Sequence, residues 1–425
     1  MPSVGAESEK VAIVSVDTHV GPPFDALRQY CPKLYLDDFD AYAASYEFSI
    51  NVDPTTFFSE PYLETLATRA FNPLMHYDPV DRIKYMDEDG IAAEVVYHGA
   101  VNGTTIPFLL GSGGTGGISS GKPETAREVE LGNEGFRIYH RWLVDYCAAA
   151  PARRLGLIHL PWWDIEACAA LIKEGRAAGL GGVNLPAPRG GMIGYNNRAW
   201  DPVWDVCEDL DMPMSSHAGF ALVDDAQLAG ENAGHMTSHE ILYMSRRTIF
   251  FMLLGGVFHR HPKLRFVLCE QPGGWVYPAL KEMDSTAYGP VNPTPDYAPK
   301  KPSDFFHENC WIGLSFMSRG DVAAALKDGM EKRIMWGSDF PHAEGTYPFS
   351  VTSLRYALDG VGDEEFIRDV TGRTAAAAYG FDMAALQKIA DRIGPTMAEL
   401  RTPVDADAIP VAPGSAGFRS GEGWT

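Results

Sequence analysis

Acidic residues and histidines follow several short apolar segments of this chain, at the point where each segment ends. They are Asp17 and His19 in VDTH, His217 in SSHAG, Glu270 in FVLCEQ and Asp339 in MWGSDF. Three carboxylates and two imidazoles gathered in a water-poor pocket would repel one another or stay unpaired without a cation. Such oxygen and nitrogen ligands suit Zn, Fe or Mn, and the lack of a thiolate pattern argues against a structural zinc site. We therefore predict a divalent-metal site made of these five residues.

Further polar residues extend this set. The residues with predicted catalytic roles are Glu270, Asp339 and His342. His98 and His159 stand at or near the ends of two other apolar segments and are candidates for an additional ligand or a substrate contact, although His159 fits a core histidine equally well. Arg189 can form an ion pair with a substrate carboxylate or stabilise the conformation of its own loop, and we favour the role in the loop. The remaining histidines are interpreted as structural: His76, His140, His235, His239, His259, His261 and His307.

The elements that must position these residues alternate along the chain. Predicted strands cover 11–19, 92–98, 155–161, 181–187, 212–218, 264–271, 310–316 and 333–340. Predicted helices cover 79–89, 127–149, 164–178, 198–210, 237–260, 275–284, 319–329 and 362–379. Nearly continuous apolar strands that alternate with helices indicate a parallel sheet covered on both faces. Eight such units favour a closed (β/α)₈ barrel, with an open doubly wound sheet as the alternative.

Two insertions and both ends of the chain fall outside this repeat, so we predict one barrel with additions rather than several domains. Residues 1–10 are expected to be flexible, the barrel to span 11–401, and 402–425 to form a Pro/Gly-rich tail. Insertions 20–78 and 99–124 follow the first and second strands, which places them at the carboxyl face of a barrel, where pockets form. They are candidates for lids that shape the substrate pocket, or for arms that contact a partner subunit.

Composition limits the partners. The chain has 425 residues and a formal net charge of −21, which opposes binding to nucleic acids or anionic membranes. Its 6 cysteines are scattered without a CxxC pair and are predicted to be reduced, buried thiols. No apolar run is long enough to span a bilayer and no signal peptide is recognisable, so we expect a cytoplasmic protein. The expected partners are a small-molecule substrate and another subunit, in a homo- or hetero-oligomer.

Longer motifs around the polar residues resemble the amidohydrolase superfamily, in particular the branch of aminocarboxymuconate-semialdehyde and hydroxybenzoate decarboxylases. The motifs are VDTH, SSHAG, FVLCEQPGGW, MWGSDFPHAEGT and TGRTAAAAYGFD, and the resemblance covers most of the chain. It implies a (β/α)₈ barrel with a divalent metal at its carboxyl mouth. Carried over residue by residue, it makes Asp17, His19, His217 and Asp339 metal ligands.

The sequence departs from that decarboxylase branch at two positions. The first motif carries Asp17-Thr18-His19 where many members have HxH or ExH, and Glu270 stands where they have a catalytic histidine. The second change removes an acid/base imidazole and adds a carboxylate that can bind a second metal. An offshoot of the superfamily is similar in this respect and uses a dinuclear Fe or Mn/Fe centre to activate dioxygen. The leading hypothesis is therefore an oxygen-dependent hydroxylase with one or two divalent metals per chain.

Three alternatives stay open at this point. The first is a metal-dependent hydrolase of a C–N or C–C bond, in which the metal activates water, Asp339 takes its proton and Glu270 is a ligand or base. The second is a nonoxidative decarboxylase, in which the metal binds the substrate carboxylate. The third is a non-catalytic barrel that supports a related active subunit. Metal content per chain and the need for dioxygen distinguish them.

Overall fold

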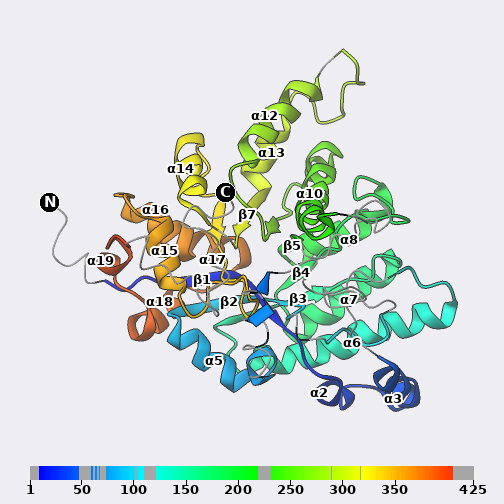
Figure 1. Ribbon diagram of the computed structural model, residues 1–425. Helices are drawn as coiled ribbons and strands as arrows, with labels where there is room; N and C mark the ends of the chain where they lie inside the picture. The colour runs from blue at the N-terminus through cyan, green and yellow to red at the C-terminus, as the bar shows by residue number, and fades with distance from the viewer. Residues whose placement is uncertain are drawn as a thin grey trace.

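A barrel of parallel strands forms the centre of the molecule (Figure 1). The computed structural model describes residues 9–46, 59–60, 63–64, 67, 73–100, 102, 104–109, 121–218, 231–288, 290–315 and 317–404. Eight strands pair in the order of the sequence, each parallel to the next. They are β1 (Ile13–Val20), β2 (Ile91–His98), β3 (Arg154–His159), β4 (Gly182–Asn184), β5 (Met214–His217), β6 (Phe266–Cys269), β7 (Cys310–Leu314) and β8 (Ile334–Trp336). All eight predicted strands are present.

The first and last strands meet, which makes the sheet a nearly closed barrel. A parallel bridge joins Thr18 of β1 to Phe340 just beyond β8. The Phe340 carbonyl also accepts the His19 N–H at 2.7 Å. The predicted (β/α)₈ barrel is therefore confirmed, and the open doubly wound alternative is wrong because the sheet has no pair of free edges.

Helices cover the outside of this barrel. Those between the strands are α5 (Pro79–Glu88), α6 (Ala126–Ala148), α7 (Ile165–Ala178), α8 (Asp201–Asp209), α10 (Ala233–Leu254), α11 (Val257–Arg260), α12 (Val276–Ala287), α13 (Pro302–Asn309) and α14 (Arg319–Asp328). After β8 follow α15 (Ser350–Ala357), α16 (Glu364–Arg368), a π-helical turn (Asp369–Arg373), α17 (Thr374–Tyr379), α18 (Met383–Ile393) and α19 (Met397–Leu400). The helix predicted over 237–260 is in fact two, because Gly256 adopts a φ of 69° and interrupts it.

The additions to the barrel are only partly described. The described part of the insertion 20–78 includes the α-helices α2 (Phe24–Arg28) and α3 (Leu36–Ser45) and the 3-10 helices Lys33–Tyr35 and Pro73–His76, which the sequence did not predict. Much of the insertion 99–124, including its Gly/Ser stretch, lies outside the described residues, as do 1–8 and 405–425. Near the chain's start, Lys10 pairs with Thr396 beside α19. The roles predicted for both insertions remain predictions.

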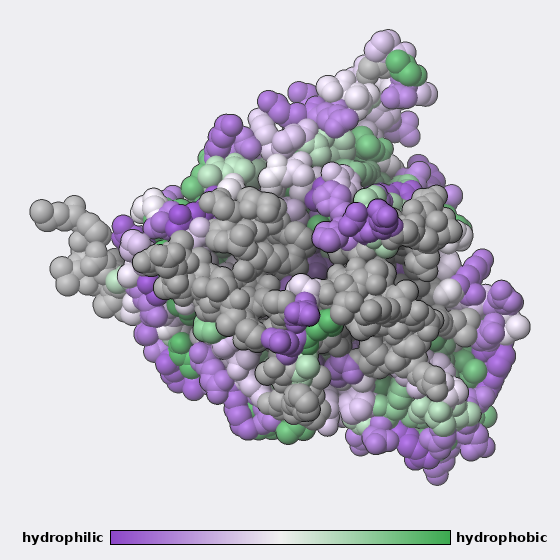
Figure 2. Space-filling model, in the orientation of Figure 1, coloured by the Kyte–Doolittle hydropathy of each residue, from purple (hydrophilic) through white to green (hydrophobic). Residues whose placement is uncertain are grey.

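The burial of residues agrees with the predicted strands. Every residue of β1 and β2 is buried, as expected for strands covered on both faces. All six cysteines are free and buried, in agreement with the sequence prediction. None of the helices within the described residues has the length and apolarity needed to cross a membrane. Hydrophilic residues predominate among the coloured side chains of the face drawn in Figure 2.

Candidate metal centre

The strand ends bring the predicted metal-site residues together at the carboxyl mouth of the barrel. Asp17 and His19 lie two residues apart on β1, and their side chains point the same way. The Oδ1 atom of Asp17 lies 2.9 Å from His217 Nε2, at the end of β5, and 3.2 Å from His19 Nε2. His19 Nε2 is also 3.3 Å from Asp339 Oδ1 beyond β8. Residues more than 300 positions apart in the sequence thus face one point.

The cluster is larger than a single-ion site requires. Three groups each offer ligand atoms within 4.8 Å of one another: Asp17, His19 and His217; His19, Asp339 and His342; and Glu270, Asp339 and Glu344. His19 and Asp339 each belong to two of these groups. Glu270 Oε2 lies 3.2 Å from His217 Nδ1, which connects the third group to the first. The arrangement offers donors for one divalent cation and for a neighbouring second one.

The backbone is unusual at two of the carboxylates. Glu270 and Asp339, which follow β6 and β8, both have a φ of 55°, in the left-handed region that costs energy for residues other than glycine. Beyond Asp339 the chain turns back sharply, and a Cβ on Gly345 would lie 2.6 Å from the Asp339 carbonyl oxygen. Only glycine fits there, so the turn that brings His342 and Glu344 beside Asp339 depends on Gly345.

Backbone carbonyls fix which ring nitrogen of two histidines faces the cluster. The Nδ1 atom of His19 lies 3.1 Å from the carbonyl oxygen of His98, and His342 Nε2 lies 2.7 Å from that of Gly99. When these nitrogens carry the proton and donate it, His19 Nε2 and His342 Nδ1 are free to bind a cation. Both rings are buried and stack at 4.0 Å. On the other side of the cluster, the Ser315 hydroxyl donates to Asp17 Oδ2.

Several atoms that face the centre of the cluster have no hydrogen-bond partner among the described residues. They are His19 Nε2, His342 Nδ1 and both carboxylate oxygens of Asp339, and all are buried. His342 Nδ1 lies 2.8 Å from Asp339 Oδ1, a contact in which neutral imidazole would set lone pair against lone pair. Either an added proton or a cation resolves this conflict. The donor set therefore fits a divalent metal.

The electrostatics of the cluster agree with that conclusion. Burial opposes the charged form of His19, but the close carboxylates of Asp17 and Asp339 raise the pKa of His19 to about 10. Burial would raise the pKa of Asp17, yet His217 and His19 hold it well below its usual range. Burial and the negative charges of Asp339 and Asp17 raise the pKa of Glu270 well above the ordinary value. The carboxylates thus favour a positive charge at this point, which a bound divalent metal would provide.

The three residues predicted as additional ligands or substrate contacts lie outside the metal-ligand groups. The His98 backbone N–H donates to His159 Nε2 at 3.1 Å, and the His159 N–H donates to His140 Nε2 at 3.0 Å. His159 thus has the role of a core histidine. The buried His98 ring packs edge-on against Tyr139, and neither ring nitrogen has a hydrogen-bond partner in the described part of the chain. A substrate contact by His98 remains a prediction.

Arg189 lies in the loop after β4. Its Nε donates to the Ala187 carbonyl at 3.2 Å, and its guanidinium lies 5.6 Å from the Trp162 ring. Burial lowers the pKa of Arg189 to about 10. The contacts to Ala187 and Trp162 agree with the loop-holding role, and the carboxylate-binding role is untested.

One residue of the cluster was missed by sequence reasoning. Glu344 lies five residues after Asp339 in DFPHAEGT, and its Oε1 is 4.0 Å from His342 Nδ1. The signal was present as three polar residues spaced D-x-x-H-x-E after the last strand. A loop has no fixed side-chain period, so this spacing alone could not predict that all three face one point.

Comparisons with known proteins agree with the barrel fold. The sequence profile of the amidohydrolase family matches residues 117–381, more than half of the chain. The structure is similar to the crystal structure of 5-carboxyvanillate decarboxylase LigW from Sphingomonas paucimobilis, with 19% identity and a TM-score of 0.60 over 88% of this chain and 100% of that one. It is also similar to an amidohydrolase from Mycobacterium avium subsp. paratuberculosis, with 18% identity and a TM-score of 0.62 over 87% and 99%.

A further similar structure contains a metal. Dihydroxybenzoic acid decarboxylase from Polaromonas sp. JS666, solved with bound manganese and the inhibitor 2-nitroresorcinol, has 16% identity and a TM-score of 0.57 over 87% of this chain and 97% of that one. Identities this low show the fold alone. No curated protein matches the chain.

Proposed function

This chain belongs to the amidohydrolase family, whose members are metal-dependent enzymes, and we propose that it catalyses the nonoxidative decarboxylation of a small aromatic carboxylate. The observation that carries the proposal is the convergence of Asp17, His19 and His217 within 4.8 Å, with Asp339 opposite them. The similar solved structures named as decarboxylases add support, and one of them holds manganese. Sequence analysis favoured hydroxylation, but the comparisons offer that reaction no support.

The reaction assigns distinct tasks to the residues of the cluster. Asp17, His19, His217 and Asp339 would hold a divalent cation, whose chemistry when bound would be polarisation of the substrate carboxylate and a neighbouring hydroxyl group. When the bond between ring carbon and carboxylate breaks, CO₂ leaves and the electron pair stays on the ring carbon, which must then receive a proton. Glu270 is suited to deliver it, because its side chain is 13% exposed whereas those of Asp17 and Asp339 are fully buried. Glu270 would thus replace the histidine that the resembling decarboxylases carry at this position.

A second candidate is oxygen-dependent hydroxylation, and one specific observation favours it. The group Glu270, Asp339 and Glu344 adds an oxygen-rich set of donors beside the histidine-rich ones. Two neighbouring redox metals can share the electrons that cleavage of dioxygen requires, and hard oxygen donors suit Fe and Mn. This candidate needs two ions per chain, whereas decarboxylation needs one.

Assays with and without dioxygen distinguish the candidates. The protein is reconstituted with Mn(II) under anaerobic conditions and incubated with a panel of hydroxylated benzoates, including 5-carboxyvanillate and 2,6-dihydroxybenzoate. We expect CO₂ release that matches substrate loss. Substrate loss that requires Fe(II), reductant and dioxygen, without CO₂, would instead establish the hydroxylase. A chain that binds at most one ion and turns over nothing in either assay would be a supporting subunit.

Substitution of Glu270 by Gln sharpens the same distinction. Gln keeps the size of the side chain but can neither deliver a carboxyl proton nor ligate as an anion. For a decarboxylase we expect at least about 100-fold lower turnover, a typical effect of removing an acid group, with one ion still bound. For a hydroxylase the variant should lose one of two ions, as elemental analysis per chain would reveal.

A further inference from the structure

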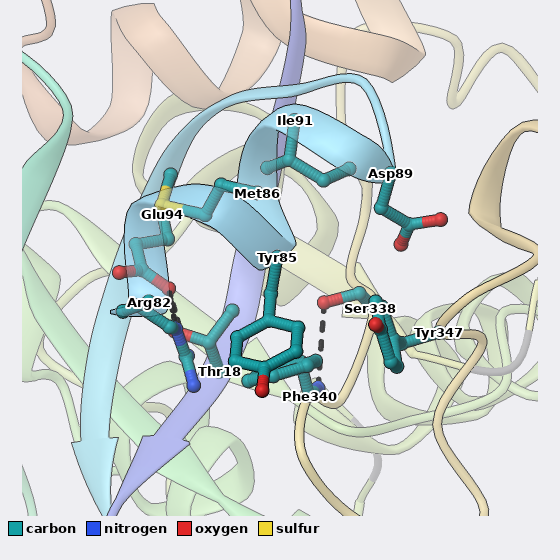
Figure 3. Close-up of a pocket in the computed structure, with 10 residues that line it drawn as sticks. All are labelled: Thr18, Arg82, Tyr85, Met86, Asp89, Ile91, Glu94, Ser338, Phe340 and Tyr347. Carbon is teal, nitrogen blue, oxygen red and sulfur yellow. Dashed lines mark hydrogen bonds and ion pairs between the residues drawn. The ribbon is translucent and has the colours of Figure 1, made fainter. Parts of the chain in front are cut away.

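Figure 3 shows a small cavity beside β1. It lies on the face of β1 opposite the metal-ligand groups, because side-chain direction alternates along a strand. Thr18, which stands between Asp17 and His19, lines it together with residues of α5, β2 and the segment after β8. Its volume of about 10 Å³ leaves room for one water at most, so it cannot hold a substrate. The side chains around it, including Arg82, Glu94 and Phe340, are packed closely enough to support the strand end.

Arg82 of α5 joins the two segments that carry ligands. Its Nη1 atom donates to the His19 carbonyl oxygen at 3.3 Å and to that of Met75 at 3.4 Å. Its guanidinium also lies over the Phe340 ring, 4.1 Å from the centroid. Phe340 is the residue after Asp339. One side chain, only 1% exposed, therefore contacts the backbone of one candidate ligand and the neighbour of another.

The guanidinium is held in place from behind. Arg82 Nε donates to Glu94 Oε2 at 2.9 Å, and Arg82 Nη2 lies 2.7 Å from the same oxygen. Figure 3 draws this pairing as a dashed line. The other carboxylate oxygen of Glu94 accepts from Arg154 Nε at 3.2 Å. Glu94 is 1% exposed, so this ion pair is shielded from solvent and its geometry is fixed.

The contacts of Arg82 can affect the ligand geometry because backbone hydrogen bonds join β1 to the segment after β8 at the candidate ligands themselves. The His19 N–H donates to the Phe340 carbonyl at 2.7 Å, and the Asp339 N–H donates to the Asp17 carbonyl at 2.9 Å. Arg82 contacts both partners of the first of these bonds, at the His19 carbonyl and at the Phe340 ring. A shift of either segment would change the 3.3 Å separation between His19 Nε2 and Asp339 Oδ1.

We propose that Arg82 is a positioning residue, which sets the spacing of His19 and Asp339 by clamping β1 to the segment after β8. The inference rests on the proposed metal-dependent function, but it concerns the geometry of the cluster and not the reaction. Outer partners of metal ligands commonly affect metal affinity by about 10- to 100-fold. Arg82 acts through His19 and Asp339 and touches no substrate.

The test compares Arg82→Met with Arg153→Met. Methionine fills much of the arginine volume, and Glu94 keeps its pair with Arg154 when Arg82 is lost. Arg153 is a matched control because it is 7% exposed and donates to the Ile91 and Ala92 carbonyls at the amino end of β2, away from the carboxyl mouth. We expect Arg82→Met to bind Mn(II) at least about 10-fold more weakly than the wild type, and Arg153→Met to bind it within about 2-fold.

A second measurement uses the metal-free protein and separates this inference from the proposed function. Long-range ¹H–¹⁵N spectra report the tautomer and surroundings of the His19 and His342 rings. We expect these signals to move in Arg82→Met and to stay in place in Arg153→Met. If the wild type binds no metal, the proposed function fails, and these spectra still decide the role of Arg82.

Equal Mn(II) affinity and unchanged ring signals in Arg82→Met, with thermal destabilisation like that of Arg153→Met, would overturn the proposal and leave Arg82 a purely structural residue. If Arg82→Met does not fold, Arg82→Lys replaces it, since lysine keeps the charge beside Glu94 but loses the planar fork. The lysine variant should then show the same losses in smaller measure. Wild-type affinity and spectra in that variant would contradict the clamp.

Discussion

Two groups of histidines in this barrel are both buried near the strand ends, yet their pKa values are shifted in opposite directions. His19 and His342 face carboxylates, and both have a raised pKa although burial opposes it. His140 and His159 accept backbone N–H groups through Nε2. Burial, with nearby positive charge, lowers the pKa of His140 to about 3 and that of His159 well below its usual value.

The difference shows that burial alone does not define a ligand histidine. What separates the groups is the partner: Asp339 lies 3.3 Å from His19 Nε2 and 2.8 Å from His342 Nδ1. His140 and His159 instead use a ring nitrogen to satisfy a backbone donor that would otherwise be buried unpaired. His19 and His342 favour positive charge at the mouth of the barrel, whereas His140 and His159 are neutral rings that accept hydrogen bonds from the backbone at the ends of β3 and β2.

The largest expected effect follows from removing the shared carboxylate. Asp339→Asn keeps the volume but removes the charge that His19 and His342 both face. We expect Mn(II) affinity to fall by more than about 100-fold, beyond the usual cost of losing an outer partner, together with turnover. Isothermal titration calorimetry with Mn(II) measures the change in affinity. His140→Gln is the control, and similar losses in that variant would erase the distinction between the two groups.

A smaller effect is expected from the hydroxyl that supports Asp17. Ser315 donates to Asp17 Oδ2, whereas Asp17 Oδ1 faces the two histidines. Ser315→Ala removes this donor and lets the carboxylate rotate, so we expect about 10-fold weaker Mn(II) binding with little change in melting temperature. Ser285→Ala, at an exposed helical hydroxyl that bonds the Glu282 carbonyl, serves as the control. Unchanged affinity in Ser315→Ala would show that Asp17 needs no such support.

The smallest expected effect is on the free energy of unfolding at acidic pH, and it tests the neutral histidine His140. The folded-state pKa of His140 is about 3, below the ordinary value of 6.5, so the unfolded chain binds more protons between these values. Stability is therefore lost as pH falls below 6.5, by up to about 1.4 kcal/mol per pH unit for this residue. His140→Gln should reduce the loss in free energy of unfolding between about pH 7 and about pH 5, measured with urea. An identical loss in wild type and variant would show that His140 does not titrate this way.

Much of this site could be predicted from the sequence. Apolar segments that end in Asp17-Thr18-His19, His217, Glu270 and Asp339 predicted both the strands and the end at which the side chains meet. The prediction succeeded because all eight strands run parallel, so their carboxyl ends form one rim whatever the helices do. The roles of these residues as metal ligands remain a proposal.

Other features were decided by the tertiary structure. The sequence determined strand order and the side of β1 that Asp17 and His19 share, because side-chain direction alternates with a period of two along a strand. It did not determine that Glu344 joins the cluster, that His159 accepts a backbone N–H, or that Arg82 reaches from α5 to the far face of β1. Those contacts join segments whose relative placement no local period fixes, and they depend on closure of the barrel, which brings β8 against β1.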